Sequence, residues 1–441
     1  MAEDLMATAG SADAPVVEIE RVDVATAVDA LEDVSAVWAA PGEPSVIAVG
    51  RARTLTGTGE NRFETVKAAA EELFDTLGDF PRIARPRLFG GVSFFGTDRL
   101  ASPWAAFEPA AFVLPAQQIV IDEDRTVLAG IDVGQEQLEH TAATLKQAAR
   151  SDHGVTVEQG TRINMTAGPA TLRTAPETWQ ARVETVAERI RAGELEKAVL
   201  AAAADVPLEA ELDLGRVLGA LGARYPDCYR FAFRAGEADG AGATFFGASP
   251  ERLVGKRGRH VDTEALAGTV RRGESETADQ EQIRHLETDE TIAGEHAVVA
   301  TRIQDQLTEI GAAVTVGDRE VHTLANVHHL RTPIEARLAQ PAHALDLVKL
   351  LHPTPALGGH PADAAQRLIA DVEPTARGWY GAPIGWFDAA GDGTFAVGIR
   401  SAVTQDGTAT LFAGNGIVAG SDPEREYREL DAKFDPIREV L

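Results

Sequence analysis

Cysteine and lysine are scarce in this chain of 441 residues. Cys228 is the single cysteine, so no internal disulfide can form, and a reducing cytoplasm is the expected compartment. Only six of the 41 basic residues are lysines. Because arginine cannot be deprotonated in proteins, each remaining lysine is a candidate for a position that needs a titratable ammonium group.

Positive charge and long apolar runs are also lacking. The formal net charge is -27 at pH 7, which argues against nucleic acids and anionic membranes as partners. No apolar run approaches the ~20 residues of a membrane helix, and the first 15 residues carry no export signal. An acidic, lysine-poor composition is typical of cytoplasmic proteins from high-salt organisms such as haloarchaea. An ordinary acidic protein from a GC-rich genome is the alternative.

The composition, with 44% hydrophobic and 25% charged residues, is that of a soluble globular protein. Length alone favours two or three domains. The expected divisions are a disordered tail at 1–15, an N-terminal part at 16–165 and a larger region at 170–441, with 153–169 as a connection or lid. Apolar periodicity predicts strands at 16–22, 45–49, 111–114, 118–122, 126–130, 197–205, 327–333 and 394–403, and helices at 63–77, 135–150, 176–192, 277–310 and 361–371.

A sharp corner at Gly247 to Leu253 follows the strand-like run Ala243 to Phe246. Pro250 fixes its own φ and favours an extended Ser249, so Glu251 is expected on a stiff bend. A stiff bend suits a catalytic carboxylate, and a solvated turn glutamate is the plainer alternative.

Lys197 begins a predicted strand. Strand alternation places Val199, Ala201 and Ala203 on the face of Lys197, which leaves room for a ligand above the ammonium group. The alternative is a charged residue at a strand end.

Two further segments offer polar groups to a ligand. Leu266 to Thr269 provides backbone N–H groups and a hydroxyl with little side-chain bulk, with a tight turn as the alternative. Glu295 lies on the apolar stripe of the predicted helix 277–310, where it needs a metal ion or a cationic partner. His328 and His329 point to opposite faces of a strand, so they cannot form a two-histidine metal site.

The C-terminal region adds one cation and a carboxylate stripe. Arg400 lies among small residues on the predicted strand 394–403, which is typical of an anion clamp, with a cross-strand salt bridge as the alternative. Glu426, Glu429 and Lys433 share one face of a helix that begins near 423. A surface Glu–Lys pair is the plainer interpretation of that stripe.

Taken together, these segments resemble the chorismate-binding enzymes, which include isochorismate synthase, salicylate synthase, anthranilate synthase component I and aminodeoxychorismate synthase component I. The similarity covers about 176 to the C-terminus and is weaker before it. The motifs that carry it, in chain order, are Lys197 to Leu200, Gly247 to Leu253, Leu266 to Thr269, Glu295 and His296, His329 to Pro333, His352 to Leu357, Gly398 to Arg400, Gly414 to Ile417, and Arg428 with Glu429.

The resemblance implies one compact α/β domain of two large, mostly antiparallel sheets flanked by helices, in place of the two domains that length suggests. It implies a Mg²⁺ ion held by Glu295 and Glu429 with Glu426 nearby, chorismate as the substrate, and a monomer. The substrate contacts that it implies are Leu266, Ala267, Gly268, Thr269, His329, Ala356, Leu357, Tyr380, Arg400, Gly414, Gly416 and Lys433.

Lys197 discriminates within this family, since the members that add water to chorismate carry a lysine there. The resemblance therefore implies an isochorismate synthase with Lys197 as general base and Glu251 as general acid, and no glutamine amidotransferase partner. Salicylate synthase shares both residues and is the main alternative. A non-catalytic chorismate-binding protein is the alternative from another class. Menaquinone synthesis is the expected pathway and siderophore synthesis the other.

The sequence departs from the family pattern in two places. Ala202 stands where the strand after the lysine usually carries arginine, and Thr291 to Gly294 lacks the charged residues usual before Glu295. We therefore expect altered secondary contacts around the metal site, with the ligands themselves retained.

Overall fold

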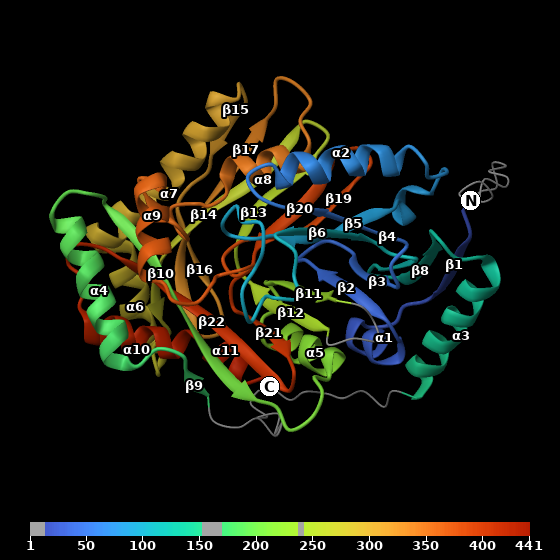
Figure 1. The fold of residues 1–441 in the computed structure, drawn as a ribbon, viewed down its shortest axis with the longest axis horizontal. Helices are drawn as coiled ribbons and strands as arrows, with labels where there is room; N and C mark the ends of the chain where they lie inside the picture. The colour runs from blue at the N-terminus through green and yellow to red at the C-terminus, as the bar shows by residue number, and fades with distance from the viewer. Residues whose placement is uncertain (1–13, 152–169, 237–241) are drawn as a thin grey trace.

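Two antiparallel β-sheets pack face to face in the computed structural model, which describes residues 14–151, 170–236 and 242–441 (Figure 1). The first sheet, in spatial order, consists of β1 (Val16–Glu20), β8 (Arg125–Gly130), β7 (Gln117–Ile121), β3 (Ser45–Val49), β2 (Val34–Ala39), β11 (Tyr229–Ala235), β12 (Ala243–Ser249), β21 (Ser401–Gln405), β22 (Thr408–Ile417), β10 (Lys197–Pro207) and β18 (Gly359–His360), with β9 (Thr171–Leu172) beside β10. The second consists of β15 (Ala313–Val316), β17 (Val327–Arg337), β14 (His260–Arg271), β13 (Arg252–Arg257), β20 (Gly393–Val397), β19 (Pro383–Asp388), β5 (Arg87–Val92), β6 (Ala110–Leu114) and β4 (Arg53–Gly57), with β16 (Glu320–Thr323) beside β17.

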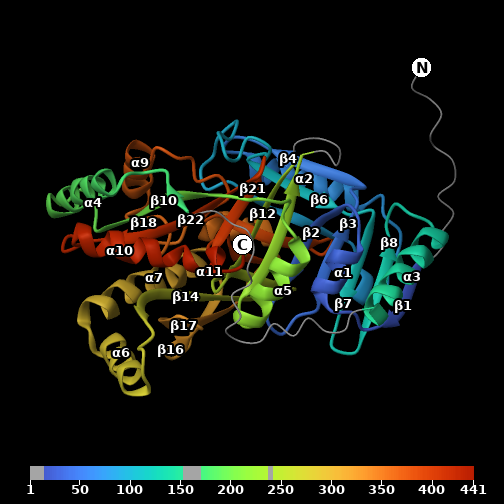
Figure 2. The same ribbon diagram turned by 90° about the horizontal axis from the view of Figure 1, so that it is seen from below.

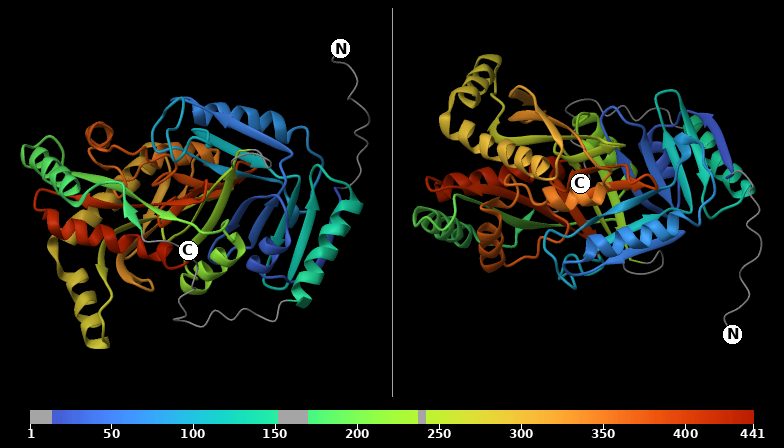
Figure 3. Two further views of the ribbon diagram at one scale, coloured as in Figure 1. Left: turned by 60° about the horizontal axis from the view of Figure 1, so that its bottom comes forward. Right: turned by 90° about the horizontal axis from the view of Figure 1, so that it is seen from above.

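Both sheets run without a break from N-terminal to C-terminal strands. In the first sheet β2 pairs with β11, and in the second β5 pairs with β19. Figure 3 shows the consequence, with the blue and teal N-terminal elements at one end of a continuous body and green, gold and red elements from later in the chain at the other. This shared pairing makes one domain of the chain and confirms the predicted fold class.

The space between the sheets is filled by large aromatic side chains. Trp104 and Phe245 lie with ring centroids 5.0 Å apart, and Phe233 and Trp379 with centroids 4.9 Å apart. Phe233 and Phe245 come from strands β11 and β12, whereas Trp104 and Trp379 come from connecting segments. Burial of such rings is the main favourable term in holding two sheets together.

Helices cover the outer faces of the sheets. Figure 2 shows α4 and α10 side by side on one end of the molecule. The helices are α1 (Val24–Ala30), α2 (Arg62–Phe74), α3 (Gln135–Ser151), α4 (Pro176–Arg191), α5 (Leu214–Arg224), α6 (Glu276–Thr288), α7 (Glu290–Glu309), α8 (Ala344–Leu351), α9 (Ala362–Val372), α10 (Pro423–Lys433) and α11 (Asp435–Arg438), with a short 3-10 turn η1 at Arg82–Ala84.

The single long helix predicted at 277–310 is wrong. The chain forms two helices, because Asp289 leaves the helical conformation and its carboxylate accepts hydrogen bonds from the backbone N–H groups of Thr291 and Ile292. Aspartate at such a position caps a new helix N-terminus. The break fixes the start of α7, the helix that carries Glu295.

Two strand predictions are also corrected. The predicted strand 394–403 is two strands in different sheets, because Gly398 to Arg400 cross from one sheet to the other and Arg400 has a φ of 47°. The strand predicted to end at Pro333 continues to Arg337, since the missing N–H of Pro333 interrupts only one ladder position. Residues 1–13 of the tail predicted at 1–15, and the whole of the connection predicted at 153–169, lie outside the described residues.

Candidate functional site

Glu251 occupies the corner between β12 and β13, where the chain leaves the first sheet and enters the second. Its backbone N–H donates to Ser249 Oγ at 3.2 Å, and its carbonyl accepts from Val397 N at 3.0 Å. The residue is only 4% exposed. The corner is therefore a buried junction, and the solvated-turn alternative for Glu251 is wrong.

The surroundings of Glu251 favour the protonated carboxyl. Burial and, to a lesser extent, the negative charge of Glu264 raise its pKa to about 8, while the positive charge of Lys197 opposes the shift. Glu264 is held in place by hydrogen bonds that it accepts from Arg252 N at 3.0 Å and Arg331 Nε at 2.6 Å. The carboxyl of Glu251, with its pKa raised in this way, is available to donate a proton near neutral pH.

Lys197 begins β10 and is 7% exposed. Its ammonium group forms an ion pair with Glu295 of α7. The need of Glu295 for a cationic partner is thus met by the lysine, although the glutamate side chain is 29% exposed and less buried than its helical position predicts. One side of the site therefore joins the predicted base to a predicted metal ligand.

Two glycines, Gly414 and Gly416, line the space beside Lys197. We call the surface that they form with Val199 and Ala201 the glycine floor. Val199 pairs with Gly416 and Ala201 with Gly414, so all four lie on the face of the lysine. A Cβ on Gly416 would lie 2.8 Å from Lys197 Cε and 3.3 Å from Glu295 Oε1. The absence of side chains at the two glycines keeps the space next to the ammonium group open, as the alternation of β10 predicts.

A second cationic region surrounds Arg400. Its Nη2 donates to His329 Nε2 at 3.0 Å, and His329 Nδ1 contacts Thr269 Oγ1 at 2.8 Å. Because arginine only donates, His329 accepts through Nε2 and is neutral; burial and the charge of Arg400 place its pKa well below the usual value. Arg400 Nη1 is buried without a hydrogen-bond partner among the described residues. It forms no ion pair with any of them, so the cross-strand salt bridge is excluded there.

The carboxylate stripe of α10 lies beside the glycine floor. Lys433 Nζ donates to Gly414 O at 3.0 Å and pairs with Glu429 Oε1 at 2.9 Å. Asn415 donates to Glu426 Oε2 at 2.9 Å. Burial raises the pKa of Glu426, and the negative charge of Glu429 raises it further. The two carboxylates thus repel one another, and the positive charge of Lys433 opposes this effect at Glu426.

This donor set fits a hard divalent cation in its chemistry. Glu295, Glu426 and Glu429 offer carboxylate oxygens, and the mutual repulsion of the last two is what a cation would relieve. Their present geometry is not that of a ligand cage: no three acidic, histidine or cysteine side chains in the described ranges are close enough together to hold a metal. Lys197 and Lys433 neutralise Glu295 and Glu429 instead.

Of the other predicted substrate contacts, some border the site and others are packing residues. Tyr380 has its hydroxyl 3.1 Å from where a Cβ of Gly414 would lie, so it borders the floor. Gly268, with a φ of 77°, forms a bulge in β14 against Ile292. Three predicted residues are mainly buried packing residues, at 7% to 9% exposure: Leu266, Ala267 and Leu357. Ala356 is half-buried beside the core of the second sheet.

The sequence interpretation missed a buried ion pair that supports β10. Arg377 donates to Glu373 Oε2 at 2.8 Å and to Leu357 O at 2.9 Å, and it also bonds Val199 O. Ala201 N donates to Glu373 Oε1 at 2.7 Å. Arg377 and Glu373 thus bond the main chain of β10 along the part of its edge that lies between β18 and β9, close to Lys197. Their side chains take the hydrogen-bonding place of a neighbouring strand there. In the sequence, the signal for this ion pair was the i,i+4 spacing of Glu373 and Arg377 shortly before Tyr380.

Two cavities elsewhere include neither Lys197 nor Glu251. One is lined by several arginines and Trp386, and the other lies near Asp29 and Asp213. The candidate site is thus identified by its charged groups and its glycine floor. Within the described part of the chain, we find no helix with the length and apolarity to cross a membrane.

The two-sheet fold and a site built from a buried lysine and carboxyl define the class of protein. The sequence matches the family model of chorismate binding enzymes over residues 7–441. The chain belongs to this family.

Its relatives include isochorismate synthases. The salicylate biosynthesis isochorismate synthase of Pseudomonas aeruginosa is 35% identical over 418 residues, covering 92% of this chain and 84% of that protein. Isochorismate synthase MenF of Bacillus subtilis is 34% identical over 360 residues, covering 81% of this chain and 74% of the relative. The structure of MenF, the menaquinone-specific isochorismate synthase from Escherichia coli, has a TM-score of 0.77 at 25% identity, covering 98% of this chain and 96% of MenF.

Proposed function

We propose that this chain is an isochorismate synthase, which converts chorismate to isochorismate by adding water at C2 and losing the hydroxyl at C4. The observation that carries the proposal is the buried Glu251, with its pKa raised to about 8, in electrostatic contact with the buried Lys197. Relatives that are isochorismate synthases support it.

The two groups have complementary tasks. The water that attacks C2 loses a proton, for which Lys197 in its neutral form is the base. The hydroxyl at C4 leaves as water after accepting the proton of Glu251. One C–O bond forms, one breaks, and the ring double bonds shift between them, so one water enters and one leaves.

Three groups hold the carboxylate of the enolpyruvyl side chain in this proposal. Arg400 offers the unpartnered Nη1, Tyr380 offers a hydroxyl, and Gly416 offers main-chain groups. His329, neutral and oriented by Arg400, contributes a polar ring without adding positive charge. In a protein of net charge -27, this local cationic region is needed for a dianionic substrate.

Glu295 and Glu429 would hold Mg²⁺, with Glu426 nearby. When bound, the cation supplies positive charge that orients and neutralises the ring carboxylate of the substrate. Glu295 also forms the ion pair with Lys197, so the proposed base and the proposed cation ligand lie in contact.

The test is a product analysis with chorismate, Mg²⁺ and a high KCl concentration. Isochorismate as the single product supports the proposal, and salicylate with pyruvate would identify a salicylate synthase instead. Anthranilate that forms only with ammonia would identify an aminating enzyme, and no turnover would leave a binding protein. Repeating the assay without Mg²⁺, after chelation, tests the metal requirement.

Menaquinone synthesis is the pathway that we propose for the product, and the menaquinone-specific MenF, one of the solved structures of similar length and fold, supports it. Deletion of the gene should then remove menaquinone and leave siderophore production intact. Activity that rises with KCl concentration up to molar levels would support the high-salt origin that the composition predicts.

A further inference from the structure

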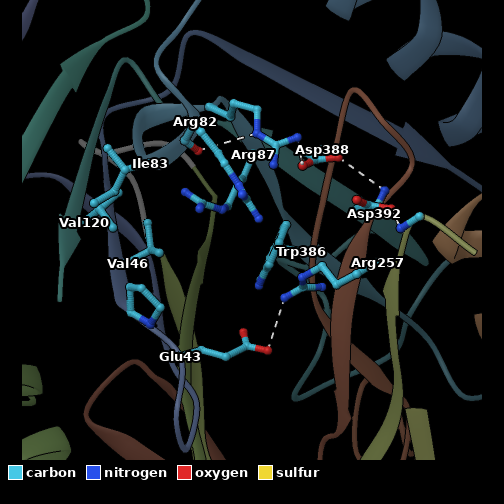
Figure 4. Close-up of a pocket in the computed structure, with 13 residues that line it drawn as sticks. Glu43, Val46, Arg82, Ile83, Arg87, Val120, Arg257, Trp386, Asp388 and Asp392 are labelled. Carbon is cyan, nitrogen blue, oxygen red and sulfur yellow. Dashed lines mark hydrogen bonds and ion pairs between the residues drawn. The ribbon is translucent and has the colours of Figure 1, made fainter. Parts of the chain in front are cut away.

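A cavity of about 670 Å³ lies between the N-terminal part of the first sheet and the second sheet, away from the candidate site (Figure 4). Such a volume is in the range of small-molecule sites. Its charged lining consists of Arg82, Arg85, Arg87, Arg257, Glu43, Asp388 and Asp392. Arginines thus outnumber acids in this cavity, in a chain whose acidic residues far exceed its basic ones.

Arg87 is the unusual member of this lining. Its Nη1 is buried and has no hydrogen-bond partner among the described residues. Burial lowers the pKa of Arg87 to about 10, with Asp388 opposing the shift and Arg85 adding to it. A buried guanidinium N–H without a partner is costly, and a bound anion would satisfy it.

Trp386 holds Arg87 in place. The guanidinium carbons of Arg87 and Arg257 each lie 4.9 Å from the centroid of the Trp386 ring, and Figure 4 shows the indole beside both arginines. The side chain of Arg87 is therefore ordered before any ligand arrives, which reduces the entropic cost of binding.

The nearby acids are paired with other basic side chains, and Asp392 pairs with Lys256 at 2.9 Å. Arg257 pairs with Glu43 at 3.1 Å, and Arg85 with Asp388 at 3.3 Å. Arg82 and Arg87 form no ion pair with an acid in the described part of the chain. Two cations are left for a ligand, and a doubly charged ligand would neutralise them.

We propose that this cavity binds a small doubly charged oxyanion, a phosphate or a dicarboxylate, with Arg87 as the buried donor and Arg82 as the exposed one. Planar guanidinium groups match the oxygen pairs of both kinds of anion. Pro44, Val46 and Val120 form an apolar wall, which limits the polar contacts to the arginine side.

The cavity is connected to the candidate site through three strands. One end of each strand adjoins the cavity: β13 near Arg257, β19 near Trp386 and β20 near Asp392. The opposite ends adjoin the candidate site, at Glu251 for β13, Tyr380 for β19 and Arg400 for β20. The six residues of β13 span about 20 Å. The two sites are thus separate, so an anion in the cavity leaves the chorismate site open.

The experiment is calorimetric titration of the full chain with inorganic phosphate and, separately, with malonate, at one fixed KCl concentration. We expect saturable binding of at least one of them. Arg87→Gln should weaken this binding at least tenfold, about 1.4 kcal/mol, without changing chorismate turnover. Arg82→Gln, an exposed change that leaves the fold intact, should weaken it severalfold, and Arg99→Gln, at an exposed arginine outside the cavity, should leave it unchanged.

The two probes distinguish the sources of the oxyanion. Binding of phosphate alone identifies a phosphate site, and binding of malonate alone identifies a dicarboxylate site. Absence of saturable binding for both probes overturns the proposal. Equal affinity in the wild type and Arg82→Gln overturns it too, even if Arg87→Gln fails to fold.

Discussion

Replacement of Glu251 by glutamine gives the most direct test of the buried-acid interpretation. The amide has nearly the shape of the carboxyl and cannot ionise. In the wild type, the pKa of Glu251 is raised to about 8, first by burial and then by Glu264. In the unfolded chain the glutamate returns to its usual pKa of about 4.5.

The sign of the effect follows from proton binding. Between pH 4.5 and 8 the folded wild type keeps a proton on Glu251 that the unfolded chain has lost. The contribution of Glu251 to the free energy of unfolding is therefore fully present below pH 4.5 and is lost as the pH rises towards 8. At about 1.36 kcal/mol per unit, the total loss is on the order of 5 kcal/mol.

The assay is urea unfolding of both proteins from pH 5 to 9 in one KCl concentration with a chelator. The free energy of unfolding of Glu251→Gln minus that of the wild type should increase with pH and level off above about 8, since other titrating groups cancel in the difference. Turnover of the variant should fall by about 10²- to 10⁴-fold. A difference that stays constant across this pH range would refute a raised pKa at Glu251, and Glu424→Gln, at an exposed position, should show such a constant difference.

The remaining predictions concern the strand beneath the site. Lys197→Ala should lose isochorismate formation by at least ~100-fold while calorimetry still detects chorismate binding, and near-normal turnover would remove Lys197 as the base. Gly416→Ala should lower kcat at least ~10-fold, about 1.4 kcal/mol, because its Cβ would lie 2.8 Å from Lys197 Cε, whereas Gly420→Ala, with nothing within 4 Å, should be silent in the same assay. Arg377→Met should destabilise the fold by about 3–5 kcal/mol in urea unfolding because it leaves Glu373 buried and unpaired. Adding Glu373→Gln to that variant should restore part of the loss, and equal stability of the single and double variants would contradict this account.

Much of the site could be predicted because its chemistry is local. The Ser-Pro corner fixes Glu251 on a bend whatever the remaining chain does, and alternation along β10 places Val199 and Ala201 beside Lys197. The glycines at 414 and 416 were expected at the site, and the structure explains them by close approach. The inferences about Glu251 and β10 depend on neighbours within a few residues, whereas the two glycines were expected from the family resemblance.

Other features needed the three-dimensional arrangement. The crossing of Gly398 to Arg400 between sheets is invisible in a continuous apolar pattern, since a single left-handed residue suffices to redirect the chain. The break at Asp289 was missed because the apolar stripe continues across it. The support of β10 by Glu373 and Arg377 arises from contacts over more than 170 positions in sequence.

The sequence by itself determined the chemical character of this protein: one lysine on a small-residue strand, one carboxyl on a stiff corner, and carboxylates at helical spacing. The tertiary structure alone decided which charges meet. It pairs Lys197 with Glu295, raises the pKa of Glu251 by burial, and places Arg87 and Arg257 against the ring of Trp386. Residue types and short-range spacing are written along the chain, whereas burial and long-range ion pairing depend on how distant strands pack.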